Sequence, residues 1–198
     1  MLFREKLLKD IEFIVEMDKL KTIKRKTKLI GLDEEEDDAE HSWHISLMAM
    51  ILAEYANEKI DLLKVIKMLL IHDLVEIYAG DTFCYDTEGN ENKRERELAA
   101  AEKLYALLDR QRADELRELW DEFEAMETPE SQFANSMDRL QPMLMNCRNN
   151  GGTWKKYDVS KTEIYQRIAP VKASSDELWC YVNLMIEDAF QKRFINKR

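Results

Sequence analysis

The chain contains three histidines, His41, His44 and His72, and all of them fall within two segments. Asp73 follows His72 directly, at the end of a strongly apolar stretch. A charge buried in such surroundings is costly unless it is paired or bound to a metal. Imidazole and carboxylate together suit a first-row divalent ion, and His41 could supply a third ligand. A buried His–Asp hydrogen bond without a metal explains the same spacing equally well.

Two further carboxylates follow the His–Asp pair. Glu76 lies four residues after His72 and shares its helix face, in a segment too apolar to be an ordinary solvated surface. Asp81 follows Gly80, where the helix is expected to end, although Gly-Asp is also a common helix-end sequence. Carboxylates beside a metal can orient water or take its proton. Both residues are therefore candidates for acid–base work.

Asp138 lies in the segment SMDRLQP, four residues before Pro142. Proline has no N–H, so the carbonyl of Asp138 loses its partner and the helix is expected to bend or loosen there. Such irregularity is consistent with a site, but proline also bends helices for packing alone. From these residues only, a surface pair of Asp138 with Arg139 is the simpler interpretation.

The elements that must position these residues are helices. Five glycines and three prolines in 198 residues favour long helices over a turn-rich β fold. Apolar periodicity and capping residues predict a first helix around 7–15, a last helix opened by Ser174 and Glu177, and a short one opened by Ser160 and Glu163. Between them, helices are expected over 39–55 (capped by Asp37 or Asp38), 62–78 (capped by Asp61), 91–108, 113–126 and 129–147.

The predicted fold class is all-α, a globular bundle of seven or eight helices in one domain over residues 1–198. The segment 62–78 is apolar nearly all round, which is typical of the central helix of a bundle. No convincing strand is found. The basic residues between 19 and 28 are interpreted as a solvated helix end and loop.

The net charge of −10 argues against broad binding to nucleic acid or to an anionic membrane, because both need a basic face. The three cysteines are far apart and form no C-x-x-C pair, which indicates reduced thiols in a cytoplasmic protein. The N-terminal segment is not a signal peptide, and no apolar run is long enough to span a membrane.

Taken in order, these motifs resemble a known family. A histidine, then a His–Asp pair, then a distant aspartate resembles the HD superfamily of metal-dependent phosphohydrolases. The segments DAEHSWHISLMAM, LLIHDLVEIYAGD and SMDRLQPML are similar, more closely, to a bacterial HD-domain family related to the 5′-deoxynucleotidases. The similarity runs from about Leu20 to the final helix.

This resemblance implies that one divalent metal ion is held by His41, His72, Asp73 and Asp138. It makes Glu76 the catalytic acid or base, with Asp81 assisting. Arg25, in LKTIKRKTK, matches an arginine that contacts the substrate phosphate. The 5′-deoxynucleotidases place a tryptophan after that arginine, where this chain has Lys26, so the resemblance does not decide between ribose and deoxyribose. His44, three residues after His41 on the same face, is expected to support the ligands or to touch the phosphate, and a packed histidine with a satisfied hydrogen bond explains it equally well.

The expected activity is hydrolysis of a phosphate monoester such as a nucleoside 5′-monophosphate. The alternatives are a non-catalytic regulatory module that binds metal or nucleotide, and an HD hydrolase acting on another nucleotide. No histidine follows His72, and this favours one ion over two. The ion could be Mn, Co, Fe, Ni, Zn or Mg. The expected partner is a small phosphorylated substrate, with no nucleic acid and no membrane; the sequence leaves a homodimer open.

Overall fold

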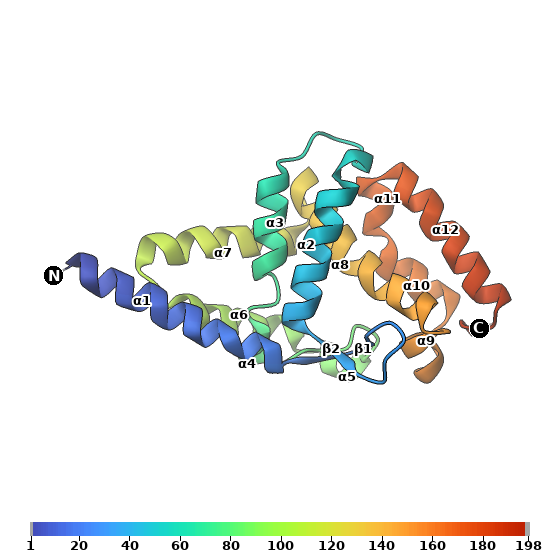
Figure 1. Cartoon of the computed structure of the whole chain (residues 1–198), viewed down its shortest axis with the longest axis horizontal. Helices are drawn as coiled ribbons and strands as arrows, with labels where there is room; N and C mark the ends of the chain where they lie inside the picture. Colours follow the sequence, from blue (N-terminus) through green and yellow to red (C-terminus); the bar gives the residue numbers. More distant parts are fainter. Residues whose placement is uncertain (1, 197–198) are drawn as a thin grey trace.

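The computed structural model describes residues 2–196 and is built almost entirely from helices, as the sequence predicts (Figure 1). Eight of the described helices have eight or more residues: α1 (Leu2–Met17), α2 (Asp38–Leu52), α3 (Leu62–Ile71), α6 (Lys93–Tyr105), α7 (Arg110–Ala125), α8 (Pro129–Arg148), α10 (Lys161–Ile168) and α12 (Asp176–Gln191). Shorter helices are α4 (Glu76–Ala79), α5 (Thr87–Asn90), α9 (Gly152–Lys156) and α11 (Pro170–Ser174), with 3₁₀ turns η1 (Asp18–Thr22) and η2 (Ala53–Tyr55).

Side-chain caps determine where several helices begin. Asp37 accepts from the N–H of Glu40, and the Glu40 side chain accepts from the N–H of Asp37, so α2 opens with a capping box. Asp61 caps α3, and Ser160 with Glu163 forms the box that opens α10. These three predicted helix starts are confirmed.

The last helix begins one residue later than predicted. Ser175, not Ser174, accepts from the N–H of Leu178 and caps α12. The Ser174 hydroxyl is already engaged, because it lies 2.7 Å from the hydroxyl of Ser136. A hydroxyl committed to a buried partner cannot also cap a helix.

The prediction of one helix over 62–78 is wrong. α3 ends at Ile71, and α4 begins only after a tight turn that contains His72 and Asp73. Nδ1 of His72 lies 2.8 Å from the carbonyl oxygen of Leu69, the acceptor that an uninterrupted helix would offer to the N–H of Asp73. The helix is therefore interrupted where the side chain of His72 hydrogen-bonds to the backbone carbonyl of Leu69.

A small antiparallel sheet corrects the expectation that the chain has no strand. β1 (Lys24–Lys28) pairs with β2 (Glu35–Asp37), with Lys24 opposite Asp37 and Lys28 opposite Glu35. The basic segment is therefore half strand, not only a solvated helix end and loop. Nearly all of these residues are charged, so no apolar alternation marked the strands.

Two apolar clusters hold the helices together. The first joins α2, α3 and α8 to the C-terminal helices, and the second packs α1, the His72–Asp73 turn, α6 and α7. Helix α8 runs through Pro142 without ending and packs against α2, α3, α7 and α11. Trp120 of α7 is fully buried in the second cluster, and its Nε1–H donates to the carbonyl oxygen of His72 at 3.2 Å.

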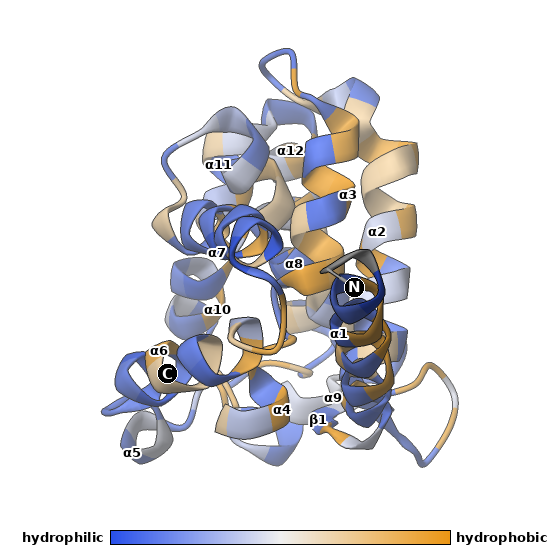
Figure 2. Cartoon of the chain, turned by 90° about the vertical axis from the view of Figure 1, so that its left-hand side faces the viewer, coloured by the Kyte–Doolittle hydropathy of each residue, from blue (hydrophilic) through white to orange (hydrophobic). Residues whose placement is uncertain are grey.

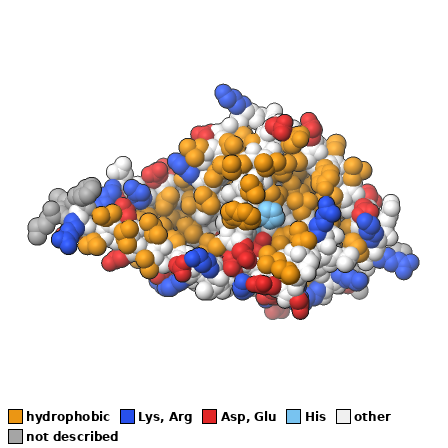
Figure 3. Space-filling model, in the orientation of Figure 1, with side chains coloured by type: hydrophobic (Ala, Val, Ile, Leu, Met, Phe, Trp, Pro, Cys, Tyr) orange, Lys and Arg blue, Asp and Glu red, His pale blue; other side chains and the backbone are white. Residues whose placement is uncertain are grey.

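The outer side of α2 is apolar as well as its inner side (Figure 2). Its exposed residues are Trp43, Leu47, Met50 and Ile51. Exposed apolar side chains continue onto α3 and along α1, and they gather on one face of the molecule (Figure 3). Within residues 2–196, no helix combines the length and apolar character needed to cross a bilayer.

Candidate metal centre and active site

Two histidines and two aspartates from three segments meet in the interior. Nε2 of His72 lies 3.0 Å from Oδ2 of Asp73 and 3.8 Å from Oδ1 of Asp138. Nε2 of His41, on α2, lies 3.1 Å from the same Asp138 oxygen. His41, His72 and Asp73 each offer an atom within 4.8 Å of the others, as a shared metal ion requires. The structure thus brings together all four residues predicted as ligands.

Both imidazoles are held through the nitrogen that faces away from the cluster. Nδ1 of His72 is bound to the Leu69 carbonyl, and Nδ1 of His41 lies 3.2 Å from Oε1 of Gln141. Nδ1 of each ring is therefore occupied on that side, and each Nε2 faces the carboxylates, where a cation would take the place of a proton. Nε2 of His72 is buried without a hydrogen-bond partner anywhere in the described chain. Metal-binding histidines show this arrangement, so these residues fit a divalent cation.

Gln141, which the sequence analysis missed, orients His41. Its Nε2–H₂ group donates to Oε1 of Glu36 at 2.5 Å, so its oxygen faces the histidine. His44 lies on the same amide, with Nδ1 3.2 Å from Nε2 of Gln141, and is not among the residues that line the adjacent cavity. The structure therefore places His44 among the groups that support the cluster. Gln141 lies three residues after Asp138, which puts both on one face of α8.

The two carboxylates of the cluster, Asp73 and Asp138, favour a positive charge between them. Burial alone would lower the pKa of His72, but the carboxylates of Asp73 and Asp138 outweigh it and raise that pKa to about 10. Burial acts to raise the pKa of Asp138, yet its interactions with His41, His72 and Arg167 hold it well below its usual range. The buried carboxylates thus stay ionised and draw positive charge between them.

Comparison with protein-family models matches residues 17–179 to the HD domain family. The chain belongs to the HD domain family. Its predicted membership is thereby confirmed, over most of the sequence.

The relatives of this HD domain include enzymes and solved structures. It is 27% identical to the mouse 5′-deoxynucleotidase HDDC2 over 58% of this chain and 56% of that protein, and 30% identical to the Dictyostelium discoideum 5′-deoxynucleotidase HDDC2 over 68% and 74%. The chain thus spans about half the length of the mammalian relatives it matches. It is also similar to a predicted metal-dependent phosphohydrolase from Magnetospirillum magnetotacticum, with 44% identity, a TM-score of 0.92 and coverage of 96% and 95%.

A second acidic group adjoins the cluster in this HD domain. Asp38, Asp73 and Glu76 have carboxylate oxygens within 4.8 Å of one another. Nη1 of Arg25, on β1, lies 2.9 Å from Asp73 and 3.3 Å from Asp38. Burial, with the charges of Asp73 and Asp38, raises the pKa of Glu76 well above its usual value. Burial and Asp73 raise the pKa of Asp38 to about 7. The sequence had offered Asp38 only as a helix cap.

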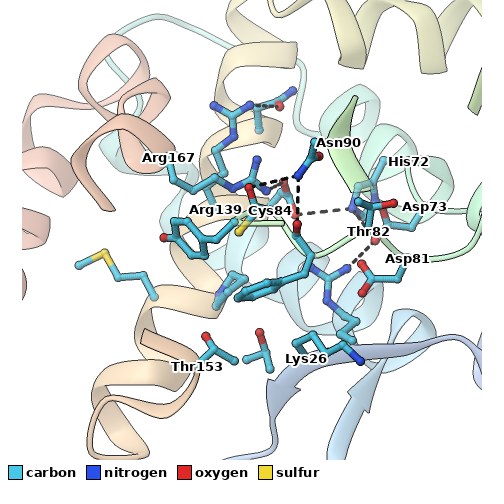
Figure 4. Close-up of a pocket in the computed structure, with 18 of the residues that line it drawn as sticks. Lys26, His72, Asp73, Asp81, Thr82, Cys84, Asn90, Arg139, Thr153 and Arg167 are labelled. Atoms are coloured by element: carbon cyan, nitrogen blue, oxygen red, sulfur yellow. Dashed lines mark hydrogen bonds and ion pairs between the residues drawn. The ribbon is translucent and has the colours of Figure 1, made fainter. Parts of the chain in front are cut away.

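A cavity of about 240 Å³ opens beside the cluster (Figure 4). Arg25, His72, Asp73, Glu76, Asp81 and Asp138 line it, together with aromatic residues from the segment after Asp81. Burial raises the pKa of Asp81. Six of the eight predicted site residues therefore line one cavity, whereas His41 and His44 do not line it.

The pairing of Asp138 with Arg139 at the surface is wrong. Asp138 is buried, and its Oδ2 lies 3.3 Å from Nη2 of Arg167, on α10. Arg139 instead donates to Oδ1 of Asn135 at 3.3 Å. No local pattern in the sequence marks Arg167, because its contact with Asp138 exists only once α10 has packed against α8.

Proposed function

We propose that this HD domain hydrolyses the phosphate monoester of a nucleoside 5′-monophosphate, with one divalent ion held by His41, His72, Asp73 and Asp138. The observation that carries the proposal is the pair of buried imidazoles whose Nε2 atoms face the carboxylates of Asp73 and Asp138 beside an open cavity. The names of the relatives, 5′-deoxynucleotidase and predicted metal-dependent phosphohydrolase, support the same activity.

The cavity supplies groups for each part of the reaction. A divalent ion supplies Lewis acidity toward a phosphoryl oxygen and makes water more acidic. Glu76 is positioned to hold and move a proton, because it lines the cavity beside Asp73 and its burial among carboxylates raises its pKa well above the usual value. Asp81 is proposed to assist from the opposite end of α4. Arg25 fixes the carboxylates of Asp73 and Asp38 and remains the predicted phosphate contact.

One ion is favoured over two. The second acidic group, Asp38, Asp73 and Glu76, already contains the guanidinium of Arg25, and the raised pKa values of Asp38 and Glu76 reduce its negative charge. A second cation there would face a resident positive charge.

The nucleoside is proposed to lie against the aromatic part of the cavity. Phe83, Tyr85 and Trp154 line it, and the rings of Phe83 and Tyr85 are 5.4 Å apart in an edge-on arrangement. A nucleobase can stack on such faces. Trp43 is exposed on α2 and does not line this cavity. Lys26, which stands where the 5′-deoxynucleotidases place a tryptophan, lines this cavity, so we propose no preference between ribose and deoxyribose.

We also propose that two copies associate through the apolar face of α1, α2 and α3. Eleven large apolar side chains lie there, each at least 41% exposed: Leu7, Leu8, Ile11, Ile14, Val15, Trp43, Leu47, Met50, Ile51, Leu63 and Leu70. At roughly 50 Å² for a half-exposed side chain, they present about 550 Å². That is close to the apolar part of the roughly 800 Å² that each partner buries in a standard interface.

Three segments far apart in the sequence supply the proposed ligands. The ligands come from α2, from the turn after α3 and from α8, so we propose that the chain works as a single domain. Cys84, Cys147 and Cys180 are free thiols, which fits a reducing compartment such as the cytoplasm.

The activity is tested by turnover on a panel of ribo- and deoxyribonucleoside 5′-monophosphates, with the purified protein loaded with each candidate metal. Wild type is expected to hold about one ion per chain and to release phosphate. His72→Ala should lose the ion and the activity, whereas His44→Ala should keep the ion. Elemental analysis that finds normal metal in His72→Ala, or two ions in wild type, would contradict the metal assignment. A metal-loaded protein that binds a nucleotide without turnover would instead indicate a regulatory module.

A further inference from the structure

Two arginines from different helices meet on the cavity wall. Arg139 comes from α8 and Arg167 from α10, and both line the cavity next to each other (Figure 4). Arg139 is largely buried, and Arg167 is about one third exposed. Two guanidinium groups that are partly removed from water repel each other. Such a pair is favourable when an anion binds between them.

Arg139 forms no ion pair with a carboxylate in the described part of the chain. Nη2 of Arg139 contacts only neutral atoms, Oδ1 of Asn135 at 3.3 Å and Sδ of Met126 at 3.2 Å. Its Nε is buried and has no hydrogen-bond partner within residues 2–196. The nearby carboxylate of Glu124 is held by Arg94 at 3.0 Å.

The carboxylate next to Arg167 is shared with the histidines. Oδ2 of Asp138 lies 3.3 Å from Arg167, while Oδ1 faces His41 and His72. Asp138 therefore joins the arginine pair to the ligand cluster through a single carboxylate. An anion bound to the two arginines would therefore be separated from the proposed metal ligands His41 and His72 only by the side chain of Asp138.

Arg25 is less free to receive an anion. It lies within 3.6 Å of three carboxylates, those of Glu36, Asp38 and Asp73. These contacts already neutralise its charge. A substrate phosphate needs donors that carry unbalanced positive charge, and guanidinium groups give it paired, charge-assisted hydrogen bonds.

We propose that Arg139 and Arg167 form an anion subsite that receives the phosphate of the monoester and places it next to the metal ligands. This inference rests on the proposed function for the identity of the substrate, but the binding of phosphate itself does not depend on turnover.

The test uses the metal-loaded protein and two probes, inorganic phosphate in a calorimetric titration and a nucleoside 5′-monophosphate in steady-state kinetics. Arg139→Gln and Arg167→Gln are each expected to weaken phosphate binding about 10- to 100-fold, the usual effect of losing a charge-assisted hydrogen bond. KM should rise by a similar factor, and metal content should stay near wild type. Arg110→Gln is the matched control, because Arg110 is a fully exposed arginine whose loss removes the same net charge.

The outcomes separate the subsite from the activity. Unchanged phosphate affinity and KM in both variants would overturn the subsite while leaving the proposed hydrolase intact. Arginine-dependent phosphate binding in a protein without turnover would support the subsite and contradict the hydrolase. If Arg139→Gln fails to fold, the more exposed Arg167→Gln decides the question alone. A loss of affinity equal to that of Arg110→Gln would show a general charge effect and would also overturn the proposal.

Discussion

Each histidine of the cluster is fixed by a bond on the side away from the cluster. The Leu69 carbonyl holds His72, and the Gln141 amide holds His41. Nδ1 of each ring is therefore occupied on that side, which leaves Nε2 to face the carboxylates. The reactive nitrogens are thereby prepared before a cation arrives, and little reorganisation opposes binding.

Substitution of Glu76 can distinguish a role in catalysis from a role in folding or metal binding. Glu76→Gln keeps the shape of the side chain and removes its ability to take a proton. Because Glu76 is not needed to complete the set of four ligands, the variant should fold and hold about one metal ion. Its kcat is expected to fall by about 10²- to 10⁴-fold, the usual contribution of a positioned acid or base. Metal content, melting temperature and kcat are measured on one sample.

Glu97 provides the matched control for this substitution. It also lines the cavity with a buried carboxylate, but it is paired with Lys93 at 3.2 Å. Glu97→Gln should change kcat by less than about 3-fold. A stable, fully metallated Glu76→Gln protein with wild-type kcat would remove Glu76 from the mechanism and leave Asp81 as the candidate.

The sequence was informative about the site wherever a residue type was rare. Only three histidines exist, and adjacent His72 and Asp73 in apolar surroundings pointed to a candidate centre, while the full set of four proposed ligands came from the resemblance to the HD superfamily. Site residues of common types could not be predicted from the sequence. Gln141 and Arg167 lie in ordinary amphipathic helices, and only the packing of those helices brings them to the cluster.

At the scale of elements, the sequence predicted the helices well where caps or strong periodicity marked their ends. Asp37 and Asp61 open α2 and α3 as predicted. The break after Ile71 could not be read from periodicity, because the residues beyond it are as apolar as those before it. Its cause is a side-chain bond to the backbone, which no hydrophobic pattern records. The hairpin of β1 and β2 was missed because charged residues form both strands.

The packing of α6 gives a prediction about pH. Tyr105 ends this helix within the second apolar cluster, and its hydroxyl has no hydrogen-bond partner in the part of the chain that the structure describes. Burial raises the pKa of Tyr105 above its usual value of about 10. The folded state therefore favours the neutral phenol, and the resulting stability is present below pH 10 and is lost as the pH rises further.

Tyr105→Phe is accordingly expected to match the wild-type free energy of unfolding at pH 8, or to exceed it by up to about 1 kcal/mol, because a buried hydroxyl without a partner is removed. Between pH 10 and 11.5 the variant should lose stability less steeply than wild type. Urea denaturation at several pH values measures both effects. Tyr181→Phe, at an exposed position of α12, is the control. Parallel curves for wild type and Tyr105→Phe would contradict the prediction.

At the scale of the whole molecule, the apolar face of α1, α2 and α3 predicts self-association. A surface helix of a monomer normally turns polar residues outward, yet the exposed positions of α2 carry only Trp43, Leu47, Met50 and Ile51. We expect light scattering to give the mass of two chains at micromolar concentration.

Charged residues on this face should separate the copies. The double substitution Leu47→Glu and Ile51→Glu is expected to give a monomer with unchanged helical content, since both side chains point outward. Leu184→Glu, on the far helix α12 and 70% exposed, should remain dimeric. A monomeric wild type, or a double variant that keeps the mass of two chains, would contradict the proposed association.

The bond between Trp120 and the backbone of His72 has an optical consequence. Trp120 is fully buried, its indole N–H is attached to the turn that carries two of the proposed ligands, and the guanidinium groups of Arg94 and Arg117 lie 4.9 and 5.2 Å from its ring centre. Indole fluorescence is sensitive to the hydrogen bond at its nitrogen and to charges near its ring. A shift of the turn when the proposed centre binds a cation is therefore expected to change the emission of Trp120, which makes this tryptophan a built-in fluorescent reporter of the proposed metal centre.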